Sequence, residues 1–507
     1  MVGYSGGAAA FVRSAFVNVA RVGVVGCGLA FAGIAPWSAP AAAQTGSGMG
    51  KSGPEVRVGA NVFVVPEAKA RSITGWLIVK AGCADEVGGN CTGIAHYLEH
   101  LLFINRDDEH RSKVAFFPDG SGNGWTTHRA TAYFQRFPSQ PATDGERLDK
   151  LMAFFAGLLT DVRVDGPQAE RERNVVLQEY QQNTGRNPFA RFSVDLNLAL
   201  MPNEPLGQRV IGSPETIRAF TPEVARAFHK LWYARDNAVI VLHGPIDPVA
   251  IKALADIHIA ALPANKSPDN LWKTPRQYKA EHVMLRTREK DARQIGVYLD
   301  KIVTYQPTAG GTGEMRAAQE VLSAFLGSRL KESPLENLME RDGLVAQARL
   351  GVSSVREGTL RLSFSGVPAD GVDPEKAIEA ARAYIADLAR RGLDQGTVDR
   401  LKLRIANERD LLAEQPGLYA QALVSWLSAH YSHEDWLARR AQAESVSVAA
   451  VNRLLKLLAG PGREVAGIML PEAGRATRPA ATRGDAPAGS DGFPTGAQPP
   501  PQVQAQP

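Results

Sequence analysis

The chain has 507 residues, more than one hydrophobic core usually supports, so we expect two domains of about 200 residues each. Charged residues make up 22% of the chain and the net charge of +4 is spread over its length, so no concentrated basic patch is available for a nucleic-acid backbone. Nucleic acid is therefore excluded as an expected partner. Beyond residue 54 no segment approaches the ~20 apolar residues of a membrane-spanning helix, so no membrane span is expected either.

The N-terminal segment predicts export from the cytoplasm. The first 54 residues contain no Asp or Glu, carry Arg13 and Arg21, and run apolar over 22–35 before the small residues "APAAAQ". This order is typical of a secretory signal peptide, which we place at 1–43, and it predicts a periplasmic or secreted protein. Lipidation at Cys27 is not expected, because the apolar run continues past that cysteine.

Two cysteines follow the predicted signal peptide. Cys83 and Cys91 flank "ADEVGGN", and in an oxidising compartment they could form a disulfide that closes this short loop. Two unpaired thiols remain an equal alternative. Neither interpretation makes them zinc ligands, because a single C-x7-C pair lacks the spacing of structural zinc sites.

Four elements are predicted in chain order in the first half. The apolar segment 73–82 predicts a buried strand, and "GIAHYLEHLLF" (93–103) predicts a helix. The segment "WTTHRATAYFQRF" (125–137) alternates with a period of two residues, which predicts a strand. A long helix begins at Pro167, a residue favoured in the first turn, and continues to Asn183.

Composition divides the chain into two domains and a tail. The segment 262–282, rich in Pro, Lys and Asn, predicts a linker between a first domain at 55–261 and a second at 283–472. The residues 474–507 are rich in Pro and Ala and have almost no large apolar side chain, so we expect a disordered tail.

The second domain contains a faint copy of the first. The stretch "VDGPQAERERNVVLQE" (164–179) aligns without gaps with "LDQGTVDRLKLRIANE" (393–408), which indicates an internal duplication. The only histidines from residue 262 onward are His282, His430 and His433, so the copy has no counterpart of the histidine pair in 93–103. Any metal chemistry is therefore expected in the first half.

The helix 93–103 contains the pattern H-x-x-E-H. His96 and His100 are four residues apart and so project from one helix face, with Glu99 beside them. Two neutral imidazoles can bind one metal ion while the carboxylate acts on water. The alternative is that both histidines are core residues and Glu99 is a solvated charge. Burying these groups among leucines without a strong partner would be costly, which favours the metal site.

A catalytic zinc site usually has three protein ligands, so a third should lie elsewhere. Glu172 and Glu179 are two helical turns apart on the long helix and share a face with Val175 and Val176. Carboxylates on an apolar stripe require a positive partner. Glu170 lacks this placement and is interpreted as a solvent charge.

These motifs together resemble the pitrilysin, insulysin and mitochondrial processing peptidase family of zinc metallopeptidases. The resemblance rests on "GIAHYLEHLLF", on "ERNVVLQE" (172–179), on "NGWTTHRATAY" (123–133) and on the segment 205–244. It implies an α+β fold of two homologous domains. In each, an antiparallel-rich mixed sheet would pack against helices, and the chain would form half of a clam-shell chamber.

The resemblance also implies roles for the site residues. His96, His100 and Glu179 would bind one Zn2+ per chain, Glu99 would be the general base, and Glu172 would orient a ligand from the second coordination sphere.

The predicted strand after the helix would bind substrate. The resemblance implies that an extended peptide adds to the edge of the strand bearing Asn123, Gly124 and Trp125. His128 lies near the site in sequence, but we expect an ordinary strand residue.

The second half departs from the family pattern. Active members have an Arg and a Tyr in a stretch that "LMERDGLVAQ" (338–347) resembles, but here Met339 and Ala346 stand in those places and Arg341 is two positions out of register. We therefore expect a heterodimer in which a homologous subunit supplies the Arg and Tyr. The expected function is zinc-dependent hydrolysis of peptides or unfolded segments, and the alternative is a non-catalytic structural or peptide-binding subunit.

Overall fold

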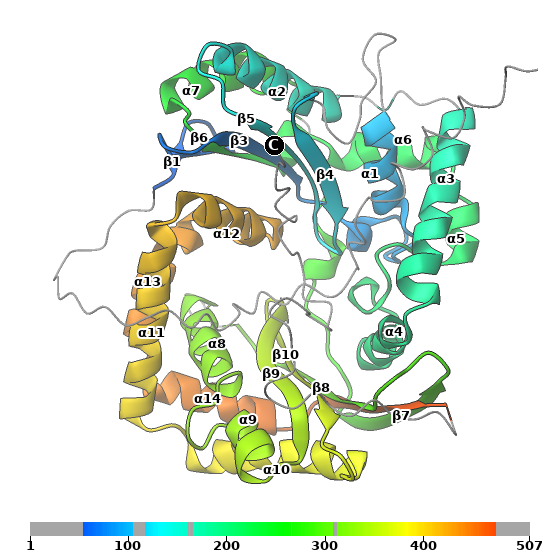
Figure 1. Cartoon of the computed structure of the whole chain (residues 1–507), viewed down its shortest axis with the longest axis vertical. Helices are drawn as coiled ribbons and strands as arrows, with labels where there is room; N and C mark the ends of the chain where they lie inside the picture. Colours follow the sequence, from blue (N-terminus) through cyan, green and yellow to red (C-terminus); the bar gives the residue numbers. More distant parts are fainter. Residues whose placement is uncertain are drawn as a thin grey trace, which may run out of the picture.

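The computed structural model describes residues 54–104, 117–160, 162, 166–264, 266–307 and 312–472. The predicted signal peptide, Cys27 and the predicted tail from 474 lie outside the described residues. Within them the chain forms two sheets, each with helices packed on both faces (Figure 1). This confirms the α+β fold class expected from the resemblance.

The first half contains a six-stranded sheet in the order β1-β2-β6-β3-β5-β4. Its strands are β1 (Val56–Arg57), β2 (Val62–Pro66), β3 (Ser72–Val79), β4 (Ser121–Thr126), β5 (Thr131–Pro138) and β6 (Ala238–Gly244). Only β2 and β6 pair in parallel. The other neighbours are antiparallel.

The second half contains a five-stranded sheet in the order β7-β11-β8-β10-β9. Its strands are β7 (Glu281–Glu289), β8 (Gly296–Thr304), β9 (Val345–Arg356), β10 (Thr359–Pro368) and β11 (Arg463–Pro471). Here too only one pair of neighbours is parallel, namely β7 and β11, which are the first and last strands of this half in chain order. Apart from β1, both sheets therefore have the same topology, as the internal duplication predicts.

Helices account for most of the remaining described chain. In the first half they are α1 (Ile94–Ile104), α2 (Asp144–Leu158), α3 (Gly166–Tyr180), α4 (Pro188–Leu200), α5 (Pro214–Arg218), α6 (Pro222–Trp232) and α7 (Pro248–His258). In the second half they are α8 (Thr312–Leu326), α9 (Pro334–Glu336), α10 (Pro374–Arg391), α11 (Gln395–Ala413), α12 (Pro416–Ser428), α13 (His433–Ser445) and α14 (Val448–Ala459). Short helical turns lie at Cys83–Asp85 (η2), Gln181–Gly185 (η3), Pro205–Gly207 (η4), Arg235–Asn237 (η5), Leu271–Lys273 (η6) and Asn337–Arg341 (η7).

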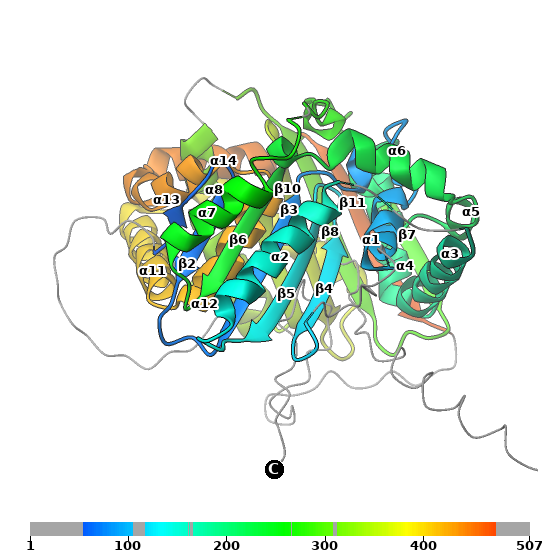
Figure 2. The same ribbon diagram turned by 90° about the horizontal axis from the view of Figure 1, so that it is seen from above.

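Each half contributes one helix to the sheet of the other half. Helix α12 lies on one face of the first sheet (Figure 1), and its Leu423 and Leu427 belong to the same buried core as Trp76 and Ile78 of β3. Helix α4 packs on the second sheet in the same way, through a core that contains Phe192, Leu196, Ile302, Val465 and Met469. Helix α4 follows the first duplicated segment, 164–179, and α12 follows the second, 393–408. The view from above shows the halves stacked on each other (Figure 2).

Strands β2, β3 and β6 in the middle of the first sheet are mostly apolar and buried along almost their whole length, because both faces are covered there. In β3, Ile73 and Leu77 face the core formed with α1, α2 and α6, whereas Trp76 and Ile78 face α12. Alternate side chains of a strand point to opposite faces, so a sheet buried on both sides requires a continuous apolar run. This explains the predicted buried strand at 73–82.

The prediction of a single strand over 125–137 is wrong. The segment is a hairpin in which β4 ends at Thr126 and β5 begins at Thr131. Thr127 closes the turn, because its backbone N–H donates to the Ala130 carbonyl at 2.8 Å and its hydroxyl accepts from the Arg129 N–H at 3.1 Å. His128 consequently lies in a turn and is not the strand residue we expected.

The predicted linker is fixed to the first half. Trp272 is 5% exposed and belongs to the core beneath α4, and the Asn270 side-chain amide donates to the Asp85 carboxylate at 2.8 Å. Strand β7 begins within the last residues of the predicted linker. The predicted domain boundaries remain a prediction. In the described ranges no helix has the length and apolarity needed to cross a bilayer.

Candidate metal centre

Helix α1, which carries the H-x-x-E-H motif, is held at its N-terminus by a buried carboxylate. Glu86 is 3% exposed and accepts hydrogen bonds from the backbone N–H groups of Thr92 (2.5 Å), Gly93 (3.1 Å) and Ala95 (2.9 Å). The first N–H groups of a helix lack partners within the helix, and a negative charge near them is favourable. Burial raises the pKa of Glu86 to about 7, although these hydrogen bonds act to lower it. Glu86 thus fixes where α1 begins.

The same helix end is packed closely against a second segment of backbone. Gly93 has a φ of +98°, and a Cβ at this position would stand 2.3 Å from the carbonyl oxygen of Ile211. Only glycine tolerates both the left-handed conformation and this contact. Glu86 and the backbone at Ile211 therefore together set the position and direction of α1.

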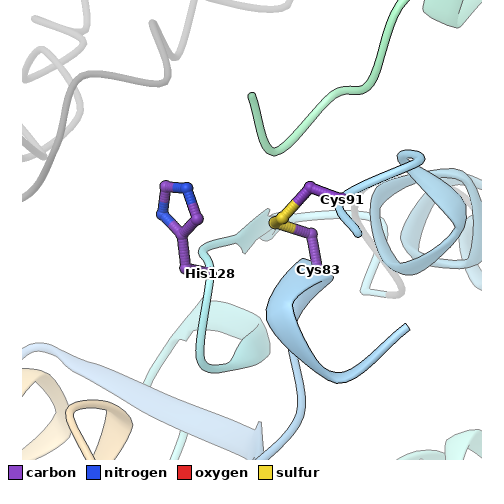
Figure 3. A group of neighbouring side chains, drawn as sticks. All are labelled: Cys83, Cys91 and His128. Carbon is purple, nitrogen blue, oxygen red and sulfur yellow. A yellow bond between two sulfur atoms is a disulfide. The ribbon is translucent and has the colours of Figure 1, made fainter. Parts of the chain in front are cut away.

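A disulfide closes the loop that contains Glu86. Cys83 and Cys91 are bonded, which is the first of the two alternatives considered from the sequence. Figure 3 shows the bonded sulfur atoms with the His128 ring beside them. The His128 Nε2–H donates to the Gln208 carbonyl at 2.8 Å. Because both sulfurs are in the bond, this group of three residues does not offer thiolate ligands to a metal.

The two histidines of α1 converge on Glu179 of α3. The Glu179 Oε2 lies 3.5 Å from His96 Nε2 and 3.4 Å from His100 Nε2, and the three ligand atoms all lie within 4.8 Å of one another. Ligand atoms about 2.1 Å from a tetrahedral zinc ion are about 3.4 Å apart. Among the described residues, this set combines donors that zinc accepts with two separations close to that value.

The three donors differ in their ionisation when no metal is bound. Burial lowers the pKa of His96 to about 4, so its imidazole is neutral at pH 7. Burial also opposes charge on His100, but hydrogen bonds to Glu172 and Glu179 outweigh it and raise the pKa to about 10. Burial acts against charge on Glu179 as well, yet the hydrogen bond from His100 and the nearby imidazoles lower the Glu179 pKa.

Glu172 contacts His100 through Nδ1, whereas Glu179 lies near Nε2 of the same ring. Its Oε2 lies 3.3 Å from His100 Nδ1, so Nδ1–H donates to the carboxylate, and Nε2 is the ring nitrogen on the side of Glu179. A carboxylate behind a metal-binding imidazole fixes its tautomer and orientation.

The apolar stripe predicted on the long helix is narrower than expected, because Val176 is buried but Val175 is 37% exposed. Glu170 forms an exposed ion pair with Arg173, consistent with a solvent charge.

Glu99 lies beside this group at the edge of the first sheet. Thr126 Oγ1 donates to Glu99 Oε2 at 2.7 Å, and Glu99 is 5% exposed. A Cβ at Gly124 would stand 2.8 Å from Glu99 Oε1, so glycine leaves room for this oxygen. Burial raises the pKa of Glu99 to about 7, against His100 and the Thr126 hydroxyl, which lower it. A carboxylate with this pKa can exchange protons near neutral pH.

Asn123, Gly124 and Trp125 lie on β4, which is the last strand at this edge of the sheet. Among the described strands β4 pairs only with β5, so its other main-chain edge has no partner strand there. Asn123 Oδ1 accepts from the Gly124 N–H at 2.9 Å, and Trp125 packs on Phe134 at the core beneath α12. Their role in substrate binding remains a prediction.

Two residues at the site were not singled out from the sequence. Thr126 lies inside the segment 123–133, two residues after Gly124, and its hydroxyl could have been predicted as a hydrogen-bond donor to a site carboxylate. Glu86 is separated from α1 by a glycine-rich loop, so only the folded structure reveals that it caps the helix.

The residues that replace the expected Arg and Tyr have local roles. Met339 lies in η7 and packs against the core of the second half, and Ala346 lies on β9. Arg341 donates to Asp342 at 2.7 Å and to the Tyr384 hydroxyl at 2.9 Å. All these contacts lie within the second half.

Family models match both halves of the chain. A model described as "Insulinase (Peptidase family M16)" matches residues 62–213, and one described as "Peptidase M16 inactive domain" matches residues 219–405. The first match contains the whole histidine and glutamate group.

Curated relatives include bacterial proteins named as zinc proteases. The zinc protease PqqE of Helicobacter pylori is 24% identical over 377 residues, which cover 72% of this chain and 82% of that protein. The probable zinc protease PqqL of Escherichia coli is 24% identical over 257 residues, which cover 47% of this chain but only 26% of that protein. The chain thus matches about a quarter of PqqL.

Solved structures share the fold over most of the chain. A protease from Helicobacter pylori superposes with a TM-score of 0.68 at 20% identity and covers 82% of this chain and 99% of that chain. The first half of the periplasmic protease PqqL from Escherichia coli gives a TM-score of 0.67 at 18% identity, with 84% and 93% covered. Pitrilysin gives 0.64 at 19% identity and covers 80% of this chain, which corresponds to 43% of pitrilysin.

Proposed function

The chain belongs to the M16, or insulinase, family of metallopeptidases, and we propose that it is a zinc-dependent endopeptidase that hydrolyses peptides or unfolded polypeptide segments. The observation that carries this proposal is the convergence of His96 Nε2, His100 Nε2 and Glu179 Oε2 at distances of 3.4 and 3.5 Å. These three atoms would hold the zinc ion. When bound, zinc supplies Lewis-acid chemistry, because it polarises a carbonyl group and makes water more acidic.

Glu99 performs the proton transfers. Its Oε2 is held by Thr126, so Oε1 is the atom that takes a proton from the attacking water. The water oxygen forms a bond to the scissile carbonyl carbon, the C–N bond breaks, and Glu99 returns the proton to the leaving nitrogen.

The substrate binds as an extended strand along β4. Its main chain would form hydrogen bonds with the edge of β4 opposite β5, beside Gly124 and next to Glu99. Binding through the main chain accepts many sequences but requires an extended segment, so folded proteins are poor substrates.

A second, homologous subunit completes the site. Met339 and Ala346 lack the guanidinium and the phenol that the family pattern places there. The Arg341 side chain is hydrogen-bonded to Asp342 and Tyr384. We therefore propose a heterodimer in which the partner supplies an Arg and a Tyr. High peptidase activity of the purified, zinc-loaded chain on its own would contradict this arrangement.

The enzyme works in an exported compartment, by this proposal in the periplasm. The predicted signal peptide, the disulfide between Cys83 and Cys91, and the similarity to a protease described as periplasmic all support export.

The substitution Glu99→Gln tests the proposed function. We expect the variant to bind zinc in the same stoichiometry but to lose peptide hydrolysis by about 100-fold or more, because the amide cannot accept the proton. Zinc content by elemental analysis and cleavage of a quenched fluorescent peptide, both with the partner subunit present, measure the two effects. Undiminished cleavage by the variant would contradict the role of Glu99 and favour a non-catalytic subunit.

A further inference from the structure

We propose that Asn183 is a positioning residue that selects which carboxylate oxygen of Glu179 faces the metal. This inference rests on the zinc site proposed above and adds a residue to it. Asn183 acts on the site through Glu179, to which its side chain is hydrogen-bonded.

The two oxygens of Glu179 have different partners. The Asn183 Nδ2 donates to Glu179 Oε1 at 3.2 Å. The other oxygen, Oε2, is the one that lies 3.5 Å from His96 Nε2 and 3.4 Å from His100 Nε2. With Oε1 engaged, the carboxylate can rotate less about its last bond, and it presents one oxygen to the metal.

The turn that carries Asn183 is an interruption in regular helix geometry. Helix α3 ends at Tyr180, directly after Glu179, and the next residues form the π-helical turn η3. The following helix α4 is capped by Asn187, whose Oδ1 accepts from the Ala190 N–H at 3.1 Å. Single π-helical turns occur frequently at functional sites. Here the turn is anchored at both ends, so Asn183 has a fixed position beside Glu179.

The second polar atom of Asn183 has no evident structural task. Its Oδ1 is buried and has no hydrogen-bond partner in the described part of the chain. A buried acceptor without a partner is destabilising. Turning the amide over would place Oδ1 against the Glu179 carboxylate, which is repulsive, so the contact with Glu179 determines the orientation of the amide. The Asn183 side chain is therefore oriented by its hydrogen bond to the carboxylate, and this orientation leaves its Oδ1 without a partner among the described residues.

The inference is tested by Asn183→Leu, which keeps a similar volume but removes the donor, with Gln182→Leu as the matched control. Gln182 lies in the same turn and is exposed. Asn183→Ala serves as a second variant should leucine prevent folding. The full-length chain is used throughout. The measurements are the apparent zinc Kd by competition with a chromogenic chelator, the visible absorption spectrum of the Co2+-loaded protein, and the Tm of the metal-free protein.

We expect Asn183→Leu to weaken zinc binding by about 10- to 100-fold, the range usual for residues that orient metal ligands, with little change in the metal-free Tm. We also expect weaker Co2+ absorption bands, because a freed Oε1 can become an additional ligand and raise the coordination number. Gln182→Leu should match the wild type in all three measurements.

Wild-type zinc affinity and an unchanged Co2+ spectrum in both Asn183 variants would overturn the inference. So would a loss of zinc binding that is matched by an equal loss of metal-free stability in both variants, since this would indicate a purely structural role. A wild-type chain that binds no zinc would instead overturn the proposed metal site, which keeps the two failures distinguishable.

Discussion

Three groups at the candidate site are each held through one atom while another atom is left for chemistry. His100 donates its Nδ1–H to Glu172, Glu179 Oε1 accepts from Asn183, and Glu99 Oε2 accepts from Thr126. This leaves His100 Nε2 and Glu179 Oε2 close to each other, and Glu99 Oε1 beside Gly124 without a bond to Thr126. Side chains whose second polar atom is bonded lose less conformational freedom when they bind a metal or substrate, so the site is prepared in advance.

At the residue scale, the ionisation of the histidines predicts that zinc displaces a proton. In the metal-free chain His100 has a pKa raised to about 10 by its carboxylate partners, whereas His96, with a pKa of about 4, is already neutral at pH 8. Metal binding requires neutral imidazoles, so at pH 8 about one proton should leave His100 for each zinc bound. The apparent affinity should therefore rise by about tenfold per pH unit as the pH rises toward 10, and this gain should end once His100 is neutral.

Calorimetric titration with zinc in buffers of different ionisation enthalpy measures the proton release. The control is Glu172→Gln, which removes a charge that raises the His100 pKa and should reduce the number of protons released at pH 8. Binding without any proton release at pH 8 would contradict the protonated state assigned to His100.

At the scale of single elements, the start of α1 depends on a residue outside the helix. Glu86 bonds three backbone N–H groups at the helix N-terminus, and the disulfide between Cys83 and Cys91 closes the loop that holds it. A loop of this length closed by a disulfide loses unfolded-state entropy worth about 2–3 kcal/mol. The cap and the disulfide therefore stabilise the same element, which carries three of the site residues.

The cap makes a direct prediction for Glu86→Ala. The change should lower the free energy of unfolding of the metal-free chain by about 1–3 kcal/mol, because it leaves buried N–H groups without acceptors. Urea denaturation followed by circular dichroism measures the difference. The control is Glu170→Ala, which removes a carboxylate whose side chain is 65% exposed and should change stability by less than about 0.5 kcal/mol. Equal effects of both substitutions would argue against the cap.

The hairpin of β4 and β5 shows why an alternating pattern is ambiguous at this scale. The two-residue period of 125–137 continues across the turn, so the pattern alone does not reveal that the chain reverses there. The reversal depends on hydrogen bonds of the Thr127 hydroxyl and backbone with Arg129 and Ala130. A threonine that bonds nearby backbone groups favours a turn, but the same residue type is also common in strands.

At the scale of the whole molecule, the exchange of α4 and α12 joins the two halves. Removing α12 would expose Trp76 and Ile78 on the first sheet, and removing α4 would expose Ile302 and Met469 on the second. Neither sheet is covered on both faces without a helix from the other half. The duplicated halves consequently share their cores.

This exchange predicts cooperative unfolding. Differential scanning calorimetry of the full chain should give a single transition with a calorimetric enthalpy close to the van't Hoff enthalpy. Leu423→Asp, a fully buried position on α12, should lower the Tm of that single transition, because it places a charge against the first sheet. Two separated transitions, of which only one responds to Leu423→Asp, would show that the halves unfold independently.

The sequence by itself determined the family and the residues of the candidate site. The pair His96 and His100 lies in a local pattern of five residues, helical periodicity placed Glu172 and Glu179 on one face, and the resemblance to the family singled out Glu179 as the third ligand. The family and the fold class inferred from these motifs are confirmed. Only the tertiary structure decided which oxygen of Glu179 faces the histidines, that Glu86 caps α1, where the hairpin turns, and that α4 and α12 are exchanged. The physical reason is that periodicity reports the face of an element from a few neighbouring residues, whereas these features depend on turn hydrogen bonds and on contacts between segments far apart in the chain.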